Sequence, residues 1–118
     1  MWDIELYETE NGKVPVLDTF QSVKCVNKKL YAKMFRDIDL LEEKGFELTE
    51  PFSKPMENGI YELRTCFGNN IVRVFYFFFY GNKIVLTNGY IKKTNKTPPG
   101  ELKKAIKYKC DYERRCGK

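Results

Sequence analysis

Residues 71–80 read Ile71-Val72-Arg73-Val74-Phe75-Tyr76-Phe77-Phe78-Phe79-Tyr80 and are the most apolar stretch of the chain. Side chains alternate between the two faces of a β-strand, so a run that is apolar at nearly every position predicts a central strand covered on both sides. Gly81-Asn82 follows at once and is typical of a hairpin turn. Residues 83–91 are therefore expected to return beside this strand. Arg73 is the single charged side chain in the run and needs an explanation of its own.

The segments before this strand predict a strand and two helices. Residues 2–8 alternate apolar and polar side chains, as a half-buried strand does. A short helix is expected to open near Pro15, because proline suits the first helical turn. Residues 26–44 predict the longest helix, with Gly45 as its C-terminal cap. Its apolar stripe comprises Val26, Leu30, Met34, Ile38 and Leu41.

The remaining segments complete the order β-α-α-β-β-β-α. Residues 46–58 are expected to be a loop, and residues 59–66 the strand before the central one. Pro98-Pro99 leads into a last helix, whose apolar stripe is expected to comprise Leu102, Ala105, Ile106 and Cys110. The fold class is therefore α+β: a small, mostly antiparallel sheet with two N-terminal helices packed on one face and a basic C-terminal helix. With 118 residues and 42% hydrophobic side chains, residues 1–118 are expected to be one domain.

Composition excludes several classes of protein. No apolar run reaches the roughly 18 residues that a transmembrane helix needs. The acidic, alternating N-terminus is unlike a signal or transit peptide, so the expected location is the cytoplasm. The chain has no histidine, which excludes histidine-based ribonucleases, Ser-His-Asp hydrolases and zinc sites with histidine ligands.

The cysteines indicate neither a metal site nor a disulfide. Cys25, Cys66, Cys110 and Cys116 are separated by 41, 44 and 6 positions, and none of these spacings is that of a zinc knuckle. Reduced thiols in or near the core are expected, and no cofactor is predicted.

The positive charge is concentrated at the C-terminus. Residues 1–91 hold 11 basic and 13 acidic side chains, whereas residues 92–118 hold 10 basic and 3 acidic ones. Such a tail favours a polyanion partner, by default nucleic acid. The candidate contacts are Lys92, Lys96, Lys103, Lys104, Lys107 and Lys109. A solvated basic helix, or one that docks an acidic protein, remains an equal alternative.

The three expected strands place several charged side chains on one face. Glu62 and Arg64 point the same way from their strand, Arg73 lies in the neighbouring strand, and Lys92 and Lys93 lie where the third strand ends. In one interpretation Arg73 and Glu62 form a buried ion pair. In the other, which the neighbouring cations favour, Arg73 lines a phosphate site open to solvent.

Three blocks of sequence resemble the RelE/HigB toxin superfamily, and within it the phage Gp49-like HigB group. They are Gly59-Ile60-Tyr61-Glu62-Leu63-Arg64, Val72-Arg73-Val74-Phe75-Tyr76, and Asn88-Gly89-Tyr90-Ile91-Lys92-Lys93-Thr94-Asn95-Lys96-Thr97-Pro98. The segment Pro15-Val16-Leu17-Asp18-Thr19-Phe20 also matches the group's pattern. The resemblance covers almost the whole chain.

The resemblance implies the toxin of a type II toxin–antitoxin pair, a metal-independent mRNA endonuclease that acts on the ribosome and inhibits translation and growth. Such toxins cut by attack of the RNA 2′-hydroxyl on the adjacent phosphate. The implied partners are mRNA and a HigA-like helix-turn-helix antitoxin, in a heterotetramer formed through antitoxin dimerisation.

The implied roles rest on electrostatics. Arg73 is expected to bind the non-bridging phosphate oxygens, Lys93 to stabilise the leaving oxygen, and Arg64 to hold the phosphate or the adjacent strand. Glu62 is either the general base or an orienting partner of an arginine. Tyr90 either stacks on a base or belongs to the core.

The sequence also departs from RelE proper, which has alternating lysines where this chain has Ile60 and Glu62 and a tyrosine that residues near Pro99 lack. These departures leave the general base open. The alternative function is that of a ParE-like toxin, which binds and poisons DNA gyrase without cutting RNA.

Overall fold

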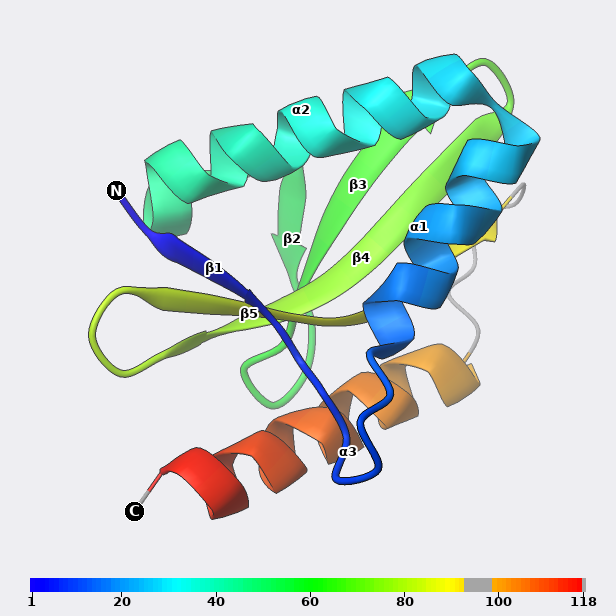
Figure 1. Ribbon diagram of the computed structural model, residues 1–118. Helices are drawn as coiled ribbons and strands as arrows, with labels where there is room; N and C mark the ends of the chain where they lie inside the picture. Colours follow the sequence, from blue (N-terminus) through cyan, green and yellow to red (C-terminus); the bar gives the residue numbers. More distant parts are fainter. Residues whose placement is uncertain (93–98, 118) are drawn as a thin grey trace.

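The computed structural model describes residues 1–92 and 99–117, and these form an α+β fold (Figure 1). The elements in chain order are β1 (Asp3–Leu6), α1 (Pro15–Val26), α2 (Lys28–Lys44), the 3-10 helix η1 (Gly45–Glu47), β2 (Ser53–Pro55), β3 (Tyr61–Phe67), β4 (Asn70–Phe79), β5 (Lys83–Lys92) and α3 (Pro99–Cys116). The fold class predicted from the sequence is confirmed. None of the helices in the described residues is long and apolar enough to cross a bilayer.

The sheet has five strands in the order β1-β5-β4-β3-β2. Strand β4 is central and pairs antiparallel with both β3 and β5. Strand β1 adds to the far side of β5 in parallel, which is the only parallel pairing among the described strands. The apolar run 71–80 is therefore the middle of the sheet, as its pattern predicts.

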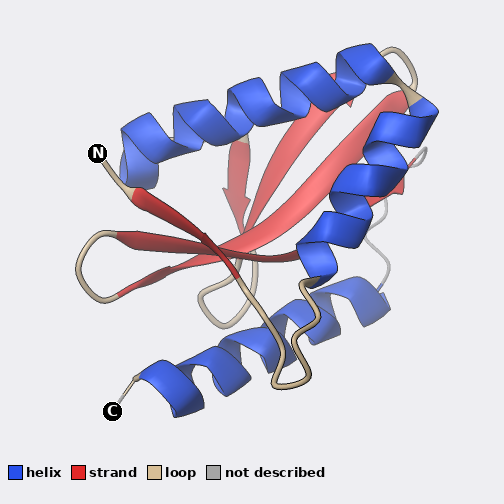
Figure 2. Ribbon diagram, in the orientation of Figure 1, coloured by secondary structure: helices blue, strands red, loops and turns tan. Residues whose placement is uncertain are grey.

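Helices cover both faces of the sheet. Figure 2 shows α1 and α2 over one face and α3 beneath the other. The first core lies under α1 and α2, and in it Leu30, Met34 and Leu41 of α2 join Leu63 and Val74 of the sheet. The second core lies under α3 and comprises Tyr7, Ile60, Phe75, Phe77, Val85, Ala105 and Tyr112. This two-sided cover is the physical reason why β4 is apolar on both faces.

Several local expectations are wrong. Residues 46–58 contain η1 and the short edge strand β2 as well as loop. The longest helix is α3, with 18 residues against 17 in α2. The segment 26–44 divides at Asn27, which ends α1 and caps α2 by accepting hydrogen bonds from the backbone N–H groups of Lys29 and Leu30. An asparagine in this position satisfies N–H groups that the first turn leaves unpaired.

The expected core position of the thiols is also wrong, because all four cysteines are exposed. On α3 the residue that faces the sheet is Tyr112, which is 4% exposed, and not Cys110. Tyr112 lies two turns after the buried Ala105, so the two residues share one helical face. Cys110 falls outside this stripe.

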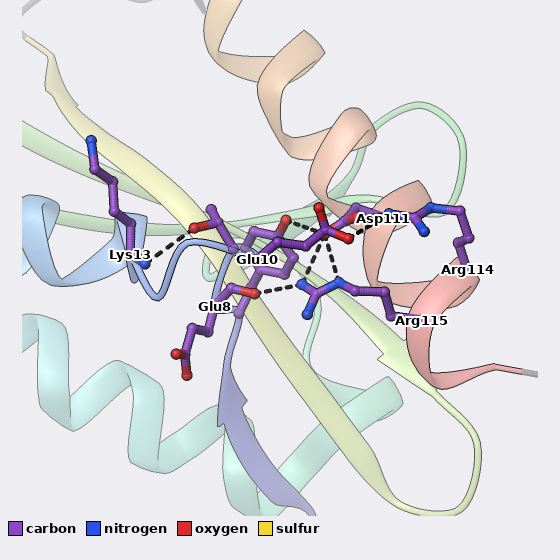
Figure 3. Close-up of polar contacts among 8 residues, drawn as sticks. Glu8, Glu10, Lys13, Asp111, Arg114 and Arg115 are labelled. Carbon is purple, nitrogen blue, oxygen red and sulfur yellow. Dashed lines mark hydrogen bonds and ion pairs between the residues drawn. The ribbon is translucent and has the colours of Figure 1, made fainter.

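The C-terminal half of α3 is fastened to the N-terminal strand and the loop after it (Figure 3). The Tyr7 hydroxyl donates to Asp111 Oδ2 at 2.6 Å, and Arg115 donates to the same carboxylate at 2.8 Å and to the carbonyl of Glu8 at 2.6 Å. Arg114 reaches both Asp111 and Glu10. The hydrogen bond from Tyr7, followed by that from Arg115, lowers the pKa of Asp111 to about 2.

We expect this carboxylate to make the attachment of α3 sensitive to acid. The ordinary pKa of the group is 3.8, so as the pH falls from about 5 towards about 2 the unfolded chain takes up its proton first and stability is lost. Asp111→Asn should therefore be less stable at neutral pH but lose less stability over this interval. Melting temperatures between pH 7 and pH 2 measure both effects.

Glu8→Gln is the matched control, because Glu8 accepts from Arg115 through its main-chain carbonyl. It should retain the acid sensitivity of the wild type. If the melting temperatures of the wild type and of Asp111→Asn fell equally between pH 7 and pH 2, the role given to this carboxylate would be contradicted.

Candidate functional site

Strands β3, β4 and β5 gather the predicted residues on the face of the sheet that α3 covers. Arg64 stands directly opposite Arg73, and Arg73 directly opposite Tyr90. Ile71 and Lys92 form the next pair towards the end of the sheet. Because side chains of directly paired residues share a face, Arg64, Arg73 and Tyr90 lie in one row, with Lys92 at the margin.

Arg73 and Glu62 form a buried ion pair. Arg73 Nη1 donates to Glu62 Oε1 at 2.8 Å, and the two residues are 4% and 1% exposed. The expected phosphate site open to solvent at Arg73 is therefore wrong, and the ion-pair interpretation describes the geometry. Since both faces of β4 are covered, a guanidinium on it needs a partner inside the protein.

Arg64, Tyr90 and Lys92 are the members of the cluster that reach the surface, since all three are half-buried. The Lys92 Nζ lies 5.9 Å from the centre of the Tyr90 ring. That ring also packs on the second core, 6.0 Å from Phe75. The contact with Phe75 fits the interpretation of Tyr90 as a core residue. Its half-buried position near the surface also fits the interpretation in which Tyr90 stacks on a base.

The arginines retain hydrogen-bonding capacity. Within the part of the chain that the structure describes, the buried Nε atoms of Arg64 and Arg73 have no acceptor. Among the described residues, Glu62 is the one carboxylate in the cluster with Arg64, Arg73 and Lys92. A buried donor without an acceptor costs free energy, so the margin of this cluster favours an added anion.

Asn88 and Glu101 belong to the same region, and the sequence interpretation missed both. The Asn88 side chain is 4% exposed and donates to the carbonyl of Glu101 at 3.2 Å, while Thr87 donates to Asn88 Oδ1 at 2.8 Å. These bonds fix the start of α3 beside β5. The Asn88-Gly89 pair in the third sequence block was the available signal.

Gly89 lets α1 approach the sheet beside the cluster. The Thr19 hydroxyl donates to the carbonyl of Gly89 at 2.9 Å. A Cβ on Gly89 would lie 2.5 Å from the carbonyl oxygen of Arg73 and 3.1 Å from the Thr19 methyl. Glycine is therefore required for the close packing of α1, β5 and β4. A pocket of about 340 Å³ lies here between α1 and the end of β5.

The predicted RNA-binding lysines have different outcomes. Lys93 and Lys96 lie outside the described residues. Lys103, Lys104 and Lys107 are exposed on the first half of α3. Lys109 is half-buried and pairs with Glu113 at 3.0 Å. The charge of α3 is therefore largely compensated within the protein in its second half, where Arg114 and Arg115 also hold Asp111.

The described residues form no metal site. Across residues 1–92 and 99–117 no three histidine, cysteine, aspartate or glutamate residues come together in a group that could hold an ion. The chemistry that the cluster can perform with the side chains described is electrostatic: it can bind a phosphate and stabilise negative charge.

We expect Arg73→Ala to reduce the free energy of unfolding by about 3–5 kcal/mol, because it removes the buried guanidinium that faces Glu62. Arg64→Ala should cost less, since Arg64 is half-buried and makes no ion pair among the described residues. Urea unfolding of both variants measures the difference. Equal losses would show that the Arg73–Glu62 pair is not the stronger structural contact.

The sequence model of a family described as phage-derived protein Gp49-like (DUF891) matches residues 21–109. The match covers most of the chain, from within α1 to within α3, and includes every residue of the cluster. No curated protein matches the chain.

Proposed function

This chain belongs to the Gp49-like family of phage-derived proteins, a family of RelE/HigB-like toxins, and on that premise we propose that it is an mRNA endonuclease, the toxin of a type II toxin–antitoxin pair. The observation that carries the proposal is the row formed by Arg64, Arg73 and Tyr90, with Lys92 at its margin. It offers cations and an aromatic ring at the margin of one face of the sheet. Phosphate and an unstacked base are what such a surface recognises in RNA.

The proposed reaction is in-line attack of the RNA 2′-hydroxyl on the adjacent phosphate. The nucleophile comes from the substrate, so the protein has to orient the phosphate and stabilise the charge that develops on it. Arg64 and Lys92 are proposed to bind the non-bridging oxygens, because both are half-buried at the margin of the cluster. Lys93 is still proposed to stabilise the negative charge on the leaving oxygen.

Glu62 and Arg73 are proposed to position the site. A general base has to come within hydrogen-bonding distance of the proton it accepts, and Glu62 is 1% exposed and bonded to Arg73. The burial supports the orienting role of Glu62 over its role as a base. Arg73 then fixes β4 against β3, which sets the position of Arg64 opposite it.

The proposed partners follow from the proposed class of toxin. They are an antitoxin, HigA-like with a helix-turn-helix domain, in a heterotetramer, and mRNA on the ribosome. Growth arrest on expression, relieved by a neighbouring gene that encodes the antitoxin, would support the pair.

For the catalytic surface we expect Arg64→Ala and Lys92→Ala each to reduce RNA cleavage by about 100-fold, the scale of losing one donor that stabilises the transition state. Folding should be largely preserved, because neither side chain is fully buried. A cleavage assay beside a melting curve on each purified variant separates the two effects. Lys44→Ala, which removes an exposed lysine in the last turn of α2, over the other face of the sheet, is the control and should cleave normally.

For the chemistry we expect products that end in a 2′,3′-cyclic phosphate or a 3′-phosphate, and cleavage that survives EDTA in a ribosome-free assay with excess protein. Attack by the 2′-hydroxyl cannot leave a 3′-hydroxyl end. Mass spectrometry of the products and titration with Mg²⁺ after chelation provide the tests. A 3′-hydroxyl end, or cleavage restored only by Mg²⁺, would refute the mechanism.

In cells, primer extension on total RNA after induction separates the two toxin classes. Discrete new 5′ ends support cleavage of mRNA. A DNA-damage response without new ends supports the gyrase-poisoning alternative and rejects the endonuclease.

A further inference from the structure

A second positively charged surface lies where α1 and α2 meet. Residues 19–36 contain five basic side chains and no acidic one. Lys24, Lys28 and Lys29 are exposed and Lys33 is half-buried at this turn between the helices. We call these four lysines the basic corner, and Arg36 lies at its margin. The function proposed above uses none of them.

The position of two of these lysines is unfavourable for the fold. Lys28 and Lys29 occupy the first turn of α2, which has no acidic residue. The N-terminus of a helix carries partial positive charge, so a cation there is destabilising and an anion stabilising. Across the residues that the structure describes, neither lysine has a carboxylate partner to offset this effect.

The basic corner lies at the same end of the sheet as the proposed RNA site. Lys33 Nζ donates to the carbonyl of Cys66 at 2.6 Å, at the end of β3 and two residues beyond Arg64. On the other side, α1 is bonded to Gly89, the neighbour of Tyr90. Figure 1 shows the meeting point of α1 and α2 beside the ends of β3 and β4. A polyanion that occupies the margin of the site can therefore continue around the end of the sheet to the corner.

The composition of the corner fits a phosphate backbone better than a protein. The cores of protein interfaces are depleted in lysine and rich in aromatic side chains. Val26 is the one large apolar side chain that is exposed among residues 19–36, all of which the structure describes. Lysine acts as a mobile point charge that suits contact with phosphates irrespective of sequence.

We propose that the basic corner binds the phosphate backbone of the RNA outside the cleavage site. The identity of the polyanion as RNA rests on the proposed function. The corner then adds affinity and holds a long RNA around the end of the sheet, while the row on β3, β4 and β5 acts on the bond that is cut.

The test compares the triple variant Lys24→Gln/Lys28→Gln/Lys29→Gln with the control Lys13→Gln/Lys44→Gln/Lys83→Gln. Both remove the same charge; the control lysines are exposed or, at Lys83, half-buried at the end of β5 remote from Tyr90 and Lys92. Binding of a single-stranded RNA longer than the 43 Å extent of the protein is measured by fluorescence anisotropy over a range of salt concentrations. Three lost contacts should reduce the slope of log K against log salt by about 2, at about 0.7 for each phosphate on single strands.

We expect the slope to fall by this amount in the corner variant, which should also bind the long RNA more weakly. The control should retain the slope of the wild type. Cleavage of a short oligonucleotide that spans only the scissile bond should be unchanged in the corner variant. Its melting temperature should stay close to that of the wild type, because the removal of two cations from the N-terminus of α2 offsets the loss of Lys24 from the last turn of α1. This readout excludes misfolding as the cause of weaker binding.

An unchanged slope, or equal losses in the two triple variants, would overturn the proposal. So would normal RNA binding together with lost binding of a purified antitoxin, because the corner would then be a protein-docking surface. If the wild type binds RNA but cuts none, the endonuclease assignment fails, and the difference in slope still decides the role of the corner.

Discussion

Strand β4 is buried on both faces, and this constraint organises the rest of the molecule. One face is covered by α1 and α2, so the other has to be covered by α3, a helix with many charged residues. Tyr112 and Ala105 provide its apolar contact, and Asp111 attaches its second half to Tyr7, the residue that follows β1. The second face of the sheet is thus covered by α3, whose polar contacts supplement a narrow apolar stripe.

The same constraint explains the geometry of the candidate site. A guanidinium on β4 cannot remain without a partner in a covered sheet, and Glu62 on β3 supplies the carboxylate. Arg64 and Tyr90 stand opposite Arg73 on the two flanking strands, and Lys92 lies nearer the end of the sheet. All three are only half-buried. A structural ion pair and a surface suited to phosphate are therefore adjacent parts of one row of side chains, and burial separates their roles.

Two groups of basic residues outside the candidate site differ in their surroundings. Lys109, Arg114 and Arg115 hold the second half of α3 through carboxylates. Lys103 and Lys107 are exposed, as are Lys24, Lys28 and Lys29 of the basic corner, and none of these five is in an ion pair among the described residues. Net charge alone does not distinguish the two groups. In the proposed function the second group adds to the salt dependence of binding to RNA that Arg64 and Lys92 contribute.

Apolar periodicity and strand alternation are local properties of the chain, so the amino-acid pattern alone predicts the fold class, the central place of β4 and the face shared by Glu62, Arg64 and Arg73. It misplaced the cysteines and the contact face of α3, since the rotation of a helix depends on the surface it packs against. The burial of Arg73 against Glu62 and the hydrogen bond by which Asn88 fixes the start of α3 are visible only in the folded protein. Burial and ion pairing depend on segments that are distant in the chain. A local sequence pattern does not show how completely one segment covers another segment.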